Sequence, residues 1–132
     1  MKYPIVQVKK SFAGFGLFAG EDIKKDTRII QYIGRIITNE EADKKPNRYI
    51  FEIDAKWSID GSPRYNIARY ANHSCNPNGI TATYPGARDK IYIEARMNIK
   101  KGEEITIDYG EEYTSVYIKK GSCRCSQCKP LS

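Results

Sequence analysis

The stretch Arg69-Tyr70-Ala71-Asn72-His73-Ser74-Cys75-Asn76-Pro77-Asn78 decides how this sequence is interpreted. An amide, an imidazole, a hydroxyl and a thiol follow one another at residues 72–75, in a polar run between apolar flanks. A core histidine with capping polar neighbours would explain part of the pattern. Cys75 is also a candidate metal ligand, so a purely structural role for the whole run is the weaker interpretation.

The other three cysteines, Cys123, Cys125 and Cys128, lie close together near the C-terminus. Four thiolates complete a tetrahedral zinc site, and Cys125 and Cys128 have a common chelate spacing. Cys75 would be the fourth ligand, with His73, the only histidine, as its rival. A disulfide framework is a weaker alternative in a chain that looks intracellular, and reduced or redox-active thiols are another.

The composition indicates one β-rich domain. The 132 residues include 18 isoleucines and 10 tyrosines but only 2 leucines, and Ile and Tyr favour strands. With 40% hydrophobic and 29% charged residues, the chain can form a core and is not wholly disordered. No apolar run approaches the roughly 18 residues of a membrane span, and residues 1–10 do not read as a signal peptide. We therefore expect an intracellular protein without a membrane partner.

Charge is distributed unevenly along the chain. The net charge of +6 permits contact with nucleic acid without requiring it. Residues 103–112 carry five acids and no base, whereas residues 119–132 carry four bases and no acid. The acidic stretch could steer a cationic substrate, or both stretches could be solvated surface.

Short apolar or alternating runs predict strands at residues 4–9, 28–37, 49–53, 57–59, 80–84, 90–95 and 104–109. Gly34 would break the second of these strands, residues 11–18 would form a glycine loop, and residues 85–89 would link a hairpin. Thr38 and Glu41 have capping-box form before a short helix over 39–45, and residues 66–70 predict one helical turn. The absence of a βαβ rhythm argues against a doubly wound parallel sheet.

Four motifs, in this order, resemble the SET-domain protein lysine methyltransferases over nearly the whole chain: Gly14-Phe15-Gly16-Leu17-Phe18, Tyr32-Ile33-Gly34, residues 69–78 and residues 102–110. The cysteines at 123, 125 and 128 resemble the family's post-SET zinc motif, although the family's last cysteine loop is usually two residues longer. The resemblance implies a SET domain at 1–112 and a post-SET tail at 113–132, together a minimal catalytic domain. It implies a mainly β fold of several small sheets with short helices and a knot-like C-terminal threading, in which 72–78 and 104–109 lie side by side.

The resemblance also implies S-adenosylmethionine as methyl donor, S-adenosylhomocysteine as product, and a lysine of a histone or another basic protein as acceptor. Cofactor-contact positions are matched by Ala13, Gly14, Phe15, Gly16, Tyr49, Arg69, Asn72 and His73. Tyr109 matches the catalytic tyrosine, and Tyr32, Tyr70 and Ile107 match positions of the acceptor pocket. Because Ile107 stands where the family carries Phe or Tyr, we expect room for di- or trimethylation. One structural zinc would be held by Cys75, Cys123, Cys125 and Cys128.

Two other classes of protein remain alternatives. A catalytically silent SET-like module would hold a basic peptide without turnover. A small zinc-containing nucleic-acid binder would explain the charge and the cysteines, but the chain lacks a standard finger spacing, so nucleic-acid binding is not the expected main function. One histidine and no nucleophile elbow argue against a Ser/His/Asp hydrolase. The expected location is cytoplasmic in a prokaryote and nuclear in a eukaryote or in a virus-infected host.

Overall fold

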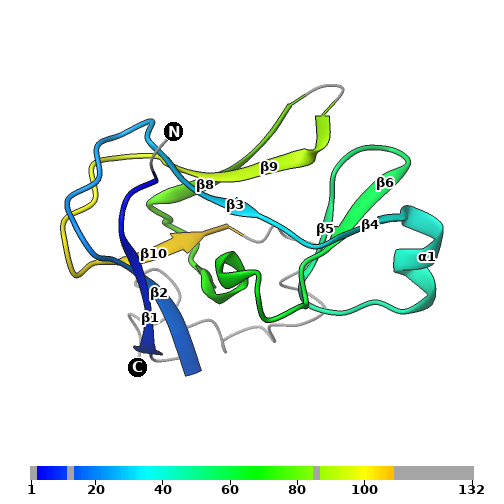
Figure 1. Cartoon of the computed structure of the whole chain (residues 1–132), viewed down its shortest axis with the longest axis horizontal. Helices are drawn as coiled ribbons and strands as arrows, with labels where there is room; N and C mark the ends of the chain where they lie inside the picture. The colour runs from blue at the N-terminus through cyan, green and yellow to red at the C-terminus, as the bar shows by residue number, and fades with distance from the viewer. Residues whose placement is uncertain (1–2, 12–13, 85–86, 109–132) are drawn as a thin grey trace.

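The computed structural model of the chain describes residues 3–11, 14–84 and 87–108, which form three small sheets (Figure 1). The first sheet has the order β1 (Val6–Ser11), β2 (Gly14–Ala19), β10 (Glu104–Ile107), β7 (Asn72–His73). The second has the order β3 (Arg28–Tyr32), β9 (Ala87–Ala95), β8 (Gly79–Tyr84). The third has the order β4 (Arg35–Thr38), β6 (Trp57–Asp60), β5 (Ile50–Glu52). The prediction of a mainly β fold of small sheets is confirmed.

Branched aliphatic side chains from the sheets form one core. The largest side chains that are almost completely buried include Leu17, Ile29, Ile59, Ile91, Ile93, Ile99 and Ile105. On β9, Ile91, Ile93 and Ala95 face the core, as expected for alternating residues of one strand face, while Tyr92 is buried on the opposite face under the Arg28 guanidinium. The excess of isoleucine over leucine therefore reflects a core built on strands.

The predicted break at Gly34 divides one apolar run into two strands of different sheets. β3 ends at Tyr32 and pairs with β9, while β4 begins at Arg35 and pairs with β6. A side chain at Gly34 would overlap the carbonyl oxygen of Asp60. Figure 1 shows the result, with the sheet of β4, β5 and β6 beside α1 at one end of the molecule and β1 and β2 at the other.

The two helical segments form close to their predicted positions. In α1 (Asn39–Lys44), Thr38 Oγ1 accepts a hydrogen bond from the Glu41 N–H at 3.1 Å, so the predicted cap is confirmed. The 3-10 turn η1 (Ile67–Tyr70) follows the buried Asn66. Neither segment, nor any other helix among the described residues, is long and apolar enough to cross a membrane.

Two predicted connections are wrong. Residues 14–18, assigned to a glycine loop, lie in β2, which pairs with β1 on one side and β10 on the other. Leu17 is completely buried there, because the hairpin with β1 and the pairing with the distant β10 override the local turn tendency of the glycines. The hairpin linker is also shorter than expected, since β9 already begins at Ala87. Residues 12–13 and 85–86 lie outside the described part.

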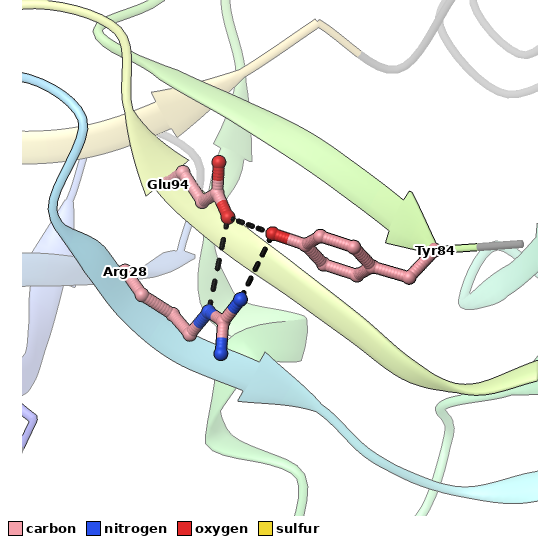
Figure 2. Close-up of polar contacts among 3 residues, drawn as sticks. All are labelled: Arg28, Tyr84 and Glu94. Atoms are coloured by element: carbon pink, nitrogen blue, oxygen red, sulfur yellow. Dashed lines mark hydrogen bonds and ion pairs between the residues drawn. The ribbon is translucent and has the colours of Figure 1, made fainter. Parts of the chain in front are cut away.

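A polar cluster joins the three strands of the second sheet on the face away from the core (Figure 2). Arg28 Nη2 donates to the Tyr84 hydroxyl at 2.9 Å, and that hydroxyl donates to Glu94 Oε2 at 2.5 Å. The Arg28 guanidinium also stacks 3.9 Å from the centre of the Tyr92 ring. The cluster therefore ties β3, β8 and β9 together independently of their backbone ladder.

The carboxylate of Asp60 closes the turn after β6. Asp60 Oδ1 accepts hydrogen bonds from the Ser62 N–H at 3.0 Å and from Asn47 Nδ2 at 3.2 Å. Burial opposes ionisation of the carboxyl group, but these hydrogen bonds and the charge of Arg35 outweigh it and lower the pKa of Asp60. A carboxyl group with a depressed folded-state pKa stabilises the fold at neutral pH, and this contribution disappears as the pH falls through that pKa.

Asp60→Asn keeps an acceptor oxygen for both donors but removes the charge. We therefore expect the variant to lose less free energy of unfolding than the wild type as the pH falls from about 5 to about 2. Urea unfolding across this range measures the difference, with Asp89→Asn, at an exposed site, as the matched control. Parallel pH profiles of the wild type and Asp60→Asn would contradict the stabilising role.

Candidate functional site

The two polar segments singled out in the sequence lie side by side. β7 pairs in parallel with β10, with Asn72 opposite Thr106 and His73 opposite Ile107. Asn78 extends this contact, because its amide donates to the Glu104 carbonyl at 2.8 Å and accepts from the Thr106 N–H at 2.9 Å. The expected adjacency of 72–78 and 104–109 is confirmed for the described residues, whereas the knot-like threading stays a prediction.

A pocket opens beside this pair of strands. Its lining residues come from β3, β5, β8, η1 and the end of β10: Tyr32, Arg48, Tyr49, Ile50, Phe51, Ala68, Arg69, Ala71, Thr81, Ile107 and Asp108. Tyr32 and Ile107, two of the three residues expected in the acceptor pocket, are 7% and 6% exposed. The pocket is therefore walled mainly by aromatic and aliphatic groups, with charged groups at Arg48, Arg69 and Asp108.

Tyr32 is held in the pocket wall by a hydrogen bond and by the space that a glycine leaves for its ring. Its hydroxyl donates to the Tyr49 carbonyl at 2.6 Å, and its ring lies where a Cβ on Gly61 would be. The fully buried Asn66 donates to the Gly61 carbonyl at 3.0 Å and accepts from the Ile33 N–H at 3.1 Å. Asn66 thus ties the segment after β3 to the turn after β6, which fixes this wall.

Arg69 and Tyr49, both expected to contact the cofactor, lie in the same pocket as Tyr32 and Ile107. The Arg69 guanidinium carbon is 4.1 Å from the centre of the Tyr49 ring and 5.4 Å from that of Tyr70. Its Nε is buried and has no hydrogen-bond partner among the described residues. The stacked rings therefore hold a cation in the wall of the pocket.

Tyr70, expected in the acceptor pocket, is not among its lining residues and packs edge-on against Phe15, with 6.1 Å between the ring centres. Phe15 is 55% exposed on β2. Gly14, with φ of 101°, adopts a conformation that only glycine takes readily. An exposed aromatic edge therefore lies beside the glycine motif.

Asn72 connects this edge to β10. Its Nδ2 donates to the Phe15 carbonyl at 3.0 Å and to Glu104 Oε2 at 2.8 Å, while Glu104 Oε1 accepts from the Ser11 hydroxyl at 2.8 Å. A Cβ at Gly16 would overlap the Glu104 carboxylate, so the glycine provides the room for it. We call Ser11, Phe15, Gly16, Asn72 and Glu104 the amide cluster.

His73 is buried between two polar neighbours. Its Nδ1 lies 3.7 Å from Asp108 Oδ1, and its Nε2 lies 3.5 Å from Cys75 Sγ. Cys75 itself is exposed.

The described residues contain no group of three or more His, Cys, Asp or Glu side chains that could hold a metal ion. Ala13, Tyr109, Cys123, Cys125 and Cys128 lie outside the described residues, and their roles stay predictions.

Glu104, Gly61 and Asn66 were not recognised from the sequence as parts of the site. Glu104 was placed in the acidic stretch 103–112 and in the motif 102–110 without a role in the site, whereas its carboxylate is partly buried and accepts two hydrogen bonds. The sequence did not distinguish this role, because an acid that alternates with Ile105 and Ile107 is the ordinary pattern of a strand with one solvated face. Gly61 and Asn66 carried no indication either, because a glycine and an asparagine are common in turns.

Comparison with known proteins agrees with this architecture. The SET domain family matches residues 14–110. Histone-lysine N-methyltransferase trr of Drosophila melanogaster is 39% identical over 110 residues, which are 76% of this chain and 4% of that protein. Histone-lysine N-methyltransferase set-2 of Caenorhabditis elegans is 44% identical over 107 residues, 73% of this chain and 7% of that protein. The H3 lysine-4 specific histone-lysine N-methyltransferase of Schizosaccharomyces pombe is 42% identical over 105 residues, 71% of this chain and 11% of that protein.

The described part of the chain combines small sheets, a parallel β7–β10 pair and an aromatic pocket beside that pair. The family match identifies a domain with these features as a SET domain. The chain belongs to the SET-domain family, and the resemblance of its motifs to that family is confirmed. It spans only between 4% and 11% of the length of the three relatives described above.

Proposed function

We propose that this chain transfers methyl groups from S-adenosylmethionine to a lysine side chain in a histone tail or another basic chromatin protein. The observation that carries the proposal is the pocket lined by Tyr32, Tyr49 and Ile107 in a SET domain. Its aromatic and aliphatic walls suit the methylene chain of a lysine. The names of the relatives, histone-lysine N-methyltransferases, support the same class of acceptor.

The acceptor amine must lose its proton before it can react, because free lysine has a pKa of about 10.4. Apolar walls disfavour the ammonium form. Arg48 and Arg69 also line the pocket, and their positive charges disfavour the ammonium form further through like-charge repulsion. Asp108, whose side chain is 57% exposed, adds a negative charge that attracts the incoming cationic residue.

The donor supplies an electrophilic methyl group on a sulfonium, so that the amine lone pair forms the new C–N bond while the C–S bond breaks and its electron pair stays on sulfur. The residues proposed to hold it are Ala13, Gly14, Phe15, Gly16, Tyr49, Arg69, Asn72 and His73. The described members fit a donor with an adenine ring and an ammonium group. Phe15 exposes an aromatic ring next to Tyr70, and Asn72 lies at the same edge with a polar side chain.

Tyr109 is the proposed catalytic residue. It directly follows Asp108, which lines the pocket. Its hydroxyl would orient the amine and the methyl group and stabilise the changing charge in the transition state. We do not assign it as a free general base, because an unperturbed tyrosine with a pKa near 10 is almost entirely protonated at neutral pH.

The substrate class is tested with intact core histones, other basic chromatin proteins and an acidic protein of similar size, each incubated with the chain and S-adenosylmethionine. Tandem mass spectrometry should locate methyl groups on lysines of the basic proteins alone. Methylation of arginine or of the acidic protein, with none on basic-protein lysine, would contradict the proposal. An intracellular location, nuclear in a eukaryotic cell, follows from such a substrate.

We also propose one structural zinc bound by Cys75, Cys123, Cys125 and Cys128. Cys75, the described member of this set, is exposed, so a zinc ion bound to it could also be reached by cysteines from elsewhere in the chain. Zinc would fix residues 113–132 to the middle of the chain.

Cys75→Ser is expected to remove a thiolate ligand, lower the bound zinc from about one equivalent to well below half, and speed proteolysis of residues 113–132. Elemental analysis and limited trypsin digestion measure the two effects, and a chelator should reproduce them in the wild type. Ser74→Ala is the neighbouring control. Full zinc occupancy and unchanged digestion of Cys75→Ser would reject the clasp.

A further inference from the structure

The carboxylate of Glu104 has an unusual set of neighbours for an acidic side chain. Its two oxygens accept from the Ser11 hydroxyl and from Asn72 Nδ2, each at 2.8 Å, and the missing side chain of Gly16 leaves room for it. None of the ion pairs among the described residues includes Glu104. Its contacts are therefore those of a group that holds neutral donors in place rather than one that neutralises a cation.

These contacts fix the orientation of the Asn72 amide. A carboxylate oxygen and a carbonyl oxygen can only accept hydrogen bonds, so the amide atom facing both Glu104 and Phe15 must be the NH₂ group. The carbonyl oxygen of Asn72 then points away from both. Among the described residues it accepts no hydrogen bond, and it is not one of the fully buried polar atoms without a partner.

We infer that Glu104 is a positioning residue for cofactor binding: it orients Asn72 so that Asn72 Oδ1 is presented to an N–H donor of the methyl donor, whose ammonium group is the matching chemistry. This role rests on the proposed function. Without the carboxylate, the Phe15 carbonyl alone would hold the amide, which could then turn its NH₂ group toward the ligand. An NH₂ group facing an ammonium is repelled rather than bound.

The charge of Glu104 is secondary in this arrangement. A glutamine at position 104 could still accept from Asn72 Nδ2 with its oxygen, while its NH₂ group donates to the Ser11 hydroxyl, which can accept as well as donate. Glu104→Gln should therefore preserve the orientation of Asn72. Glu104→Met has a similar volume but only a weakly accepting sulfur in place of the carboxylate, so it should release the amide while keeping the packing.

Calorimetric titration with S-adenosylhomocysteine, together with kcat and KM for the methyl donor, tests this role. We expect Glu104→Met to raise the Kd and KM roughly tenfold while kcat stays within about twofold, and Glu104→Gln to stay within about threefold of the wild type. Asn72→Ala/Glu104→Met should bind no more weakly than Asn72→Ala alone, because both changes remove the same contact. Glu103→Gln, at an exposed neighbouring site, is the control.

Additive effects in the double variant, wild-type affinity in Glu104→Met, or equal losses in the Gln and Met variants would overturn the inference. If Glu104→Met does not fold, Glu104→Asp replaces it, because the shorter side chain keeps the charge but no longer reaches Asn72. Wild-type affinity of Glu104→Asp for S-adenosylhomocysteine would then overturn the inference. A wild-type protein that binds no cofactor would instead reject the proposed function.

Discussion

Replacing Tyr109 with phenylalanine is expected to lower kcat for methyl transfer at least about a hundredfold. Removing one preorganised hydrogen-bond donor that stabilises a transition state lowers kcat by roughly that factor or more. The substitution removes one oxygen and keeps the ring, so the fold and the affinity for the methyl donor should change little. Single-turnover assays with a saturating donor measure the chemical step directly.

Tyr65→Phe is the matched control for this loss. Tyr65 is 65% exposed and lies outside the pocket, so the same chemical change there should leave kcat within about twofold, as is usual for surface substitutions. Near-normal turnover in Tyr109→Phe, with intact cofactor binding, would contradict the assignment of Tyr109 as the catalytic residue.

Replacing Ile107 with tyrosine is expected to change the main product from di- or trimethyl-lysine to monomethyl-lysine. Ile107 lines the pocket together with Tyr32 and is 6% exposed. A phenol ring there would fill space that a second or third methyl group needs, and its hydroxyl could hold the amine or a water molecule in place. The first methyl transfer should remain within about tenfold of the wild-type rate, because the substitution fills space needed by the later methyl groups and removes no catalytic group.

The product distribution is measured by mass spectrometry of a lysine peptide over a full time course. Ile107→Val, which enlarges the pocket, is the control and should keep the higher methylation states. A wild-type enzyme that stops at one methyl group under excess donor would contradict the expected role of Ile107.

Local sequence patterns were sufficient for the elements that depend on local interactions. The Thr38 cap needs only the Glu41 N–H three residues away. The alternation at 90–95 follows from the face of β9 that places Ile91, Ile93 and Ala95 in the core. The segment 14–18 was assigned to a loop because its conformation depends on β1 and β10, and the partner residues in β10 are almost ninety positions away.

The residues of the candidate site also divide into those predicted from local motifs and those recognised only in the folded structure. Asn72, His73, Tyr32 and Ile107 were predicted from the motifs that contain them; the structure places Tyr32 and Ile107 in the pocket and pairs Asn72 and His73 with β10. Gly61 and Asn66 position Tyr32 through contacts that only the folded chain brings together. The role of Glu104 was missed because an acid near other acids is usually solvated. In the structure, Gly16 leaves room for its carboxylate and the Ser11 hydroxyl donates a hydrogen bond to it.

The central claim is tested most directly by incubating the chain with methyl-labelled S-adenosylmethionine and a basic chromatin protein, beside Tyr109→Phe. The account predicts label on lysine with the wild-type chain and almost none with the variant, although both bind S-adenosylhomocysteine in calorimetry. Cofactor and histone binding without any transfer by the wild-type chain would contradict it and would favour a catalytically silent module that holds basic peptides.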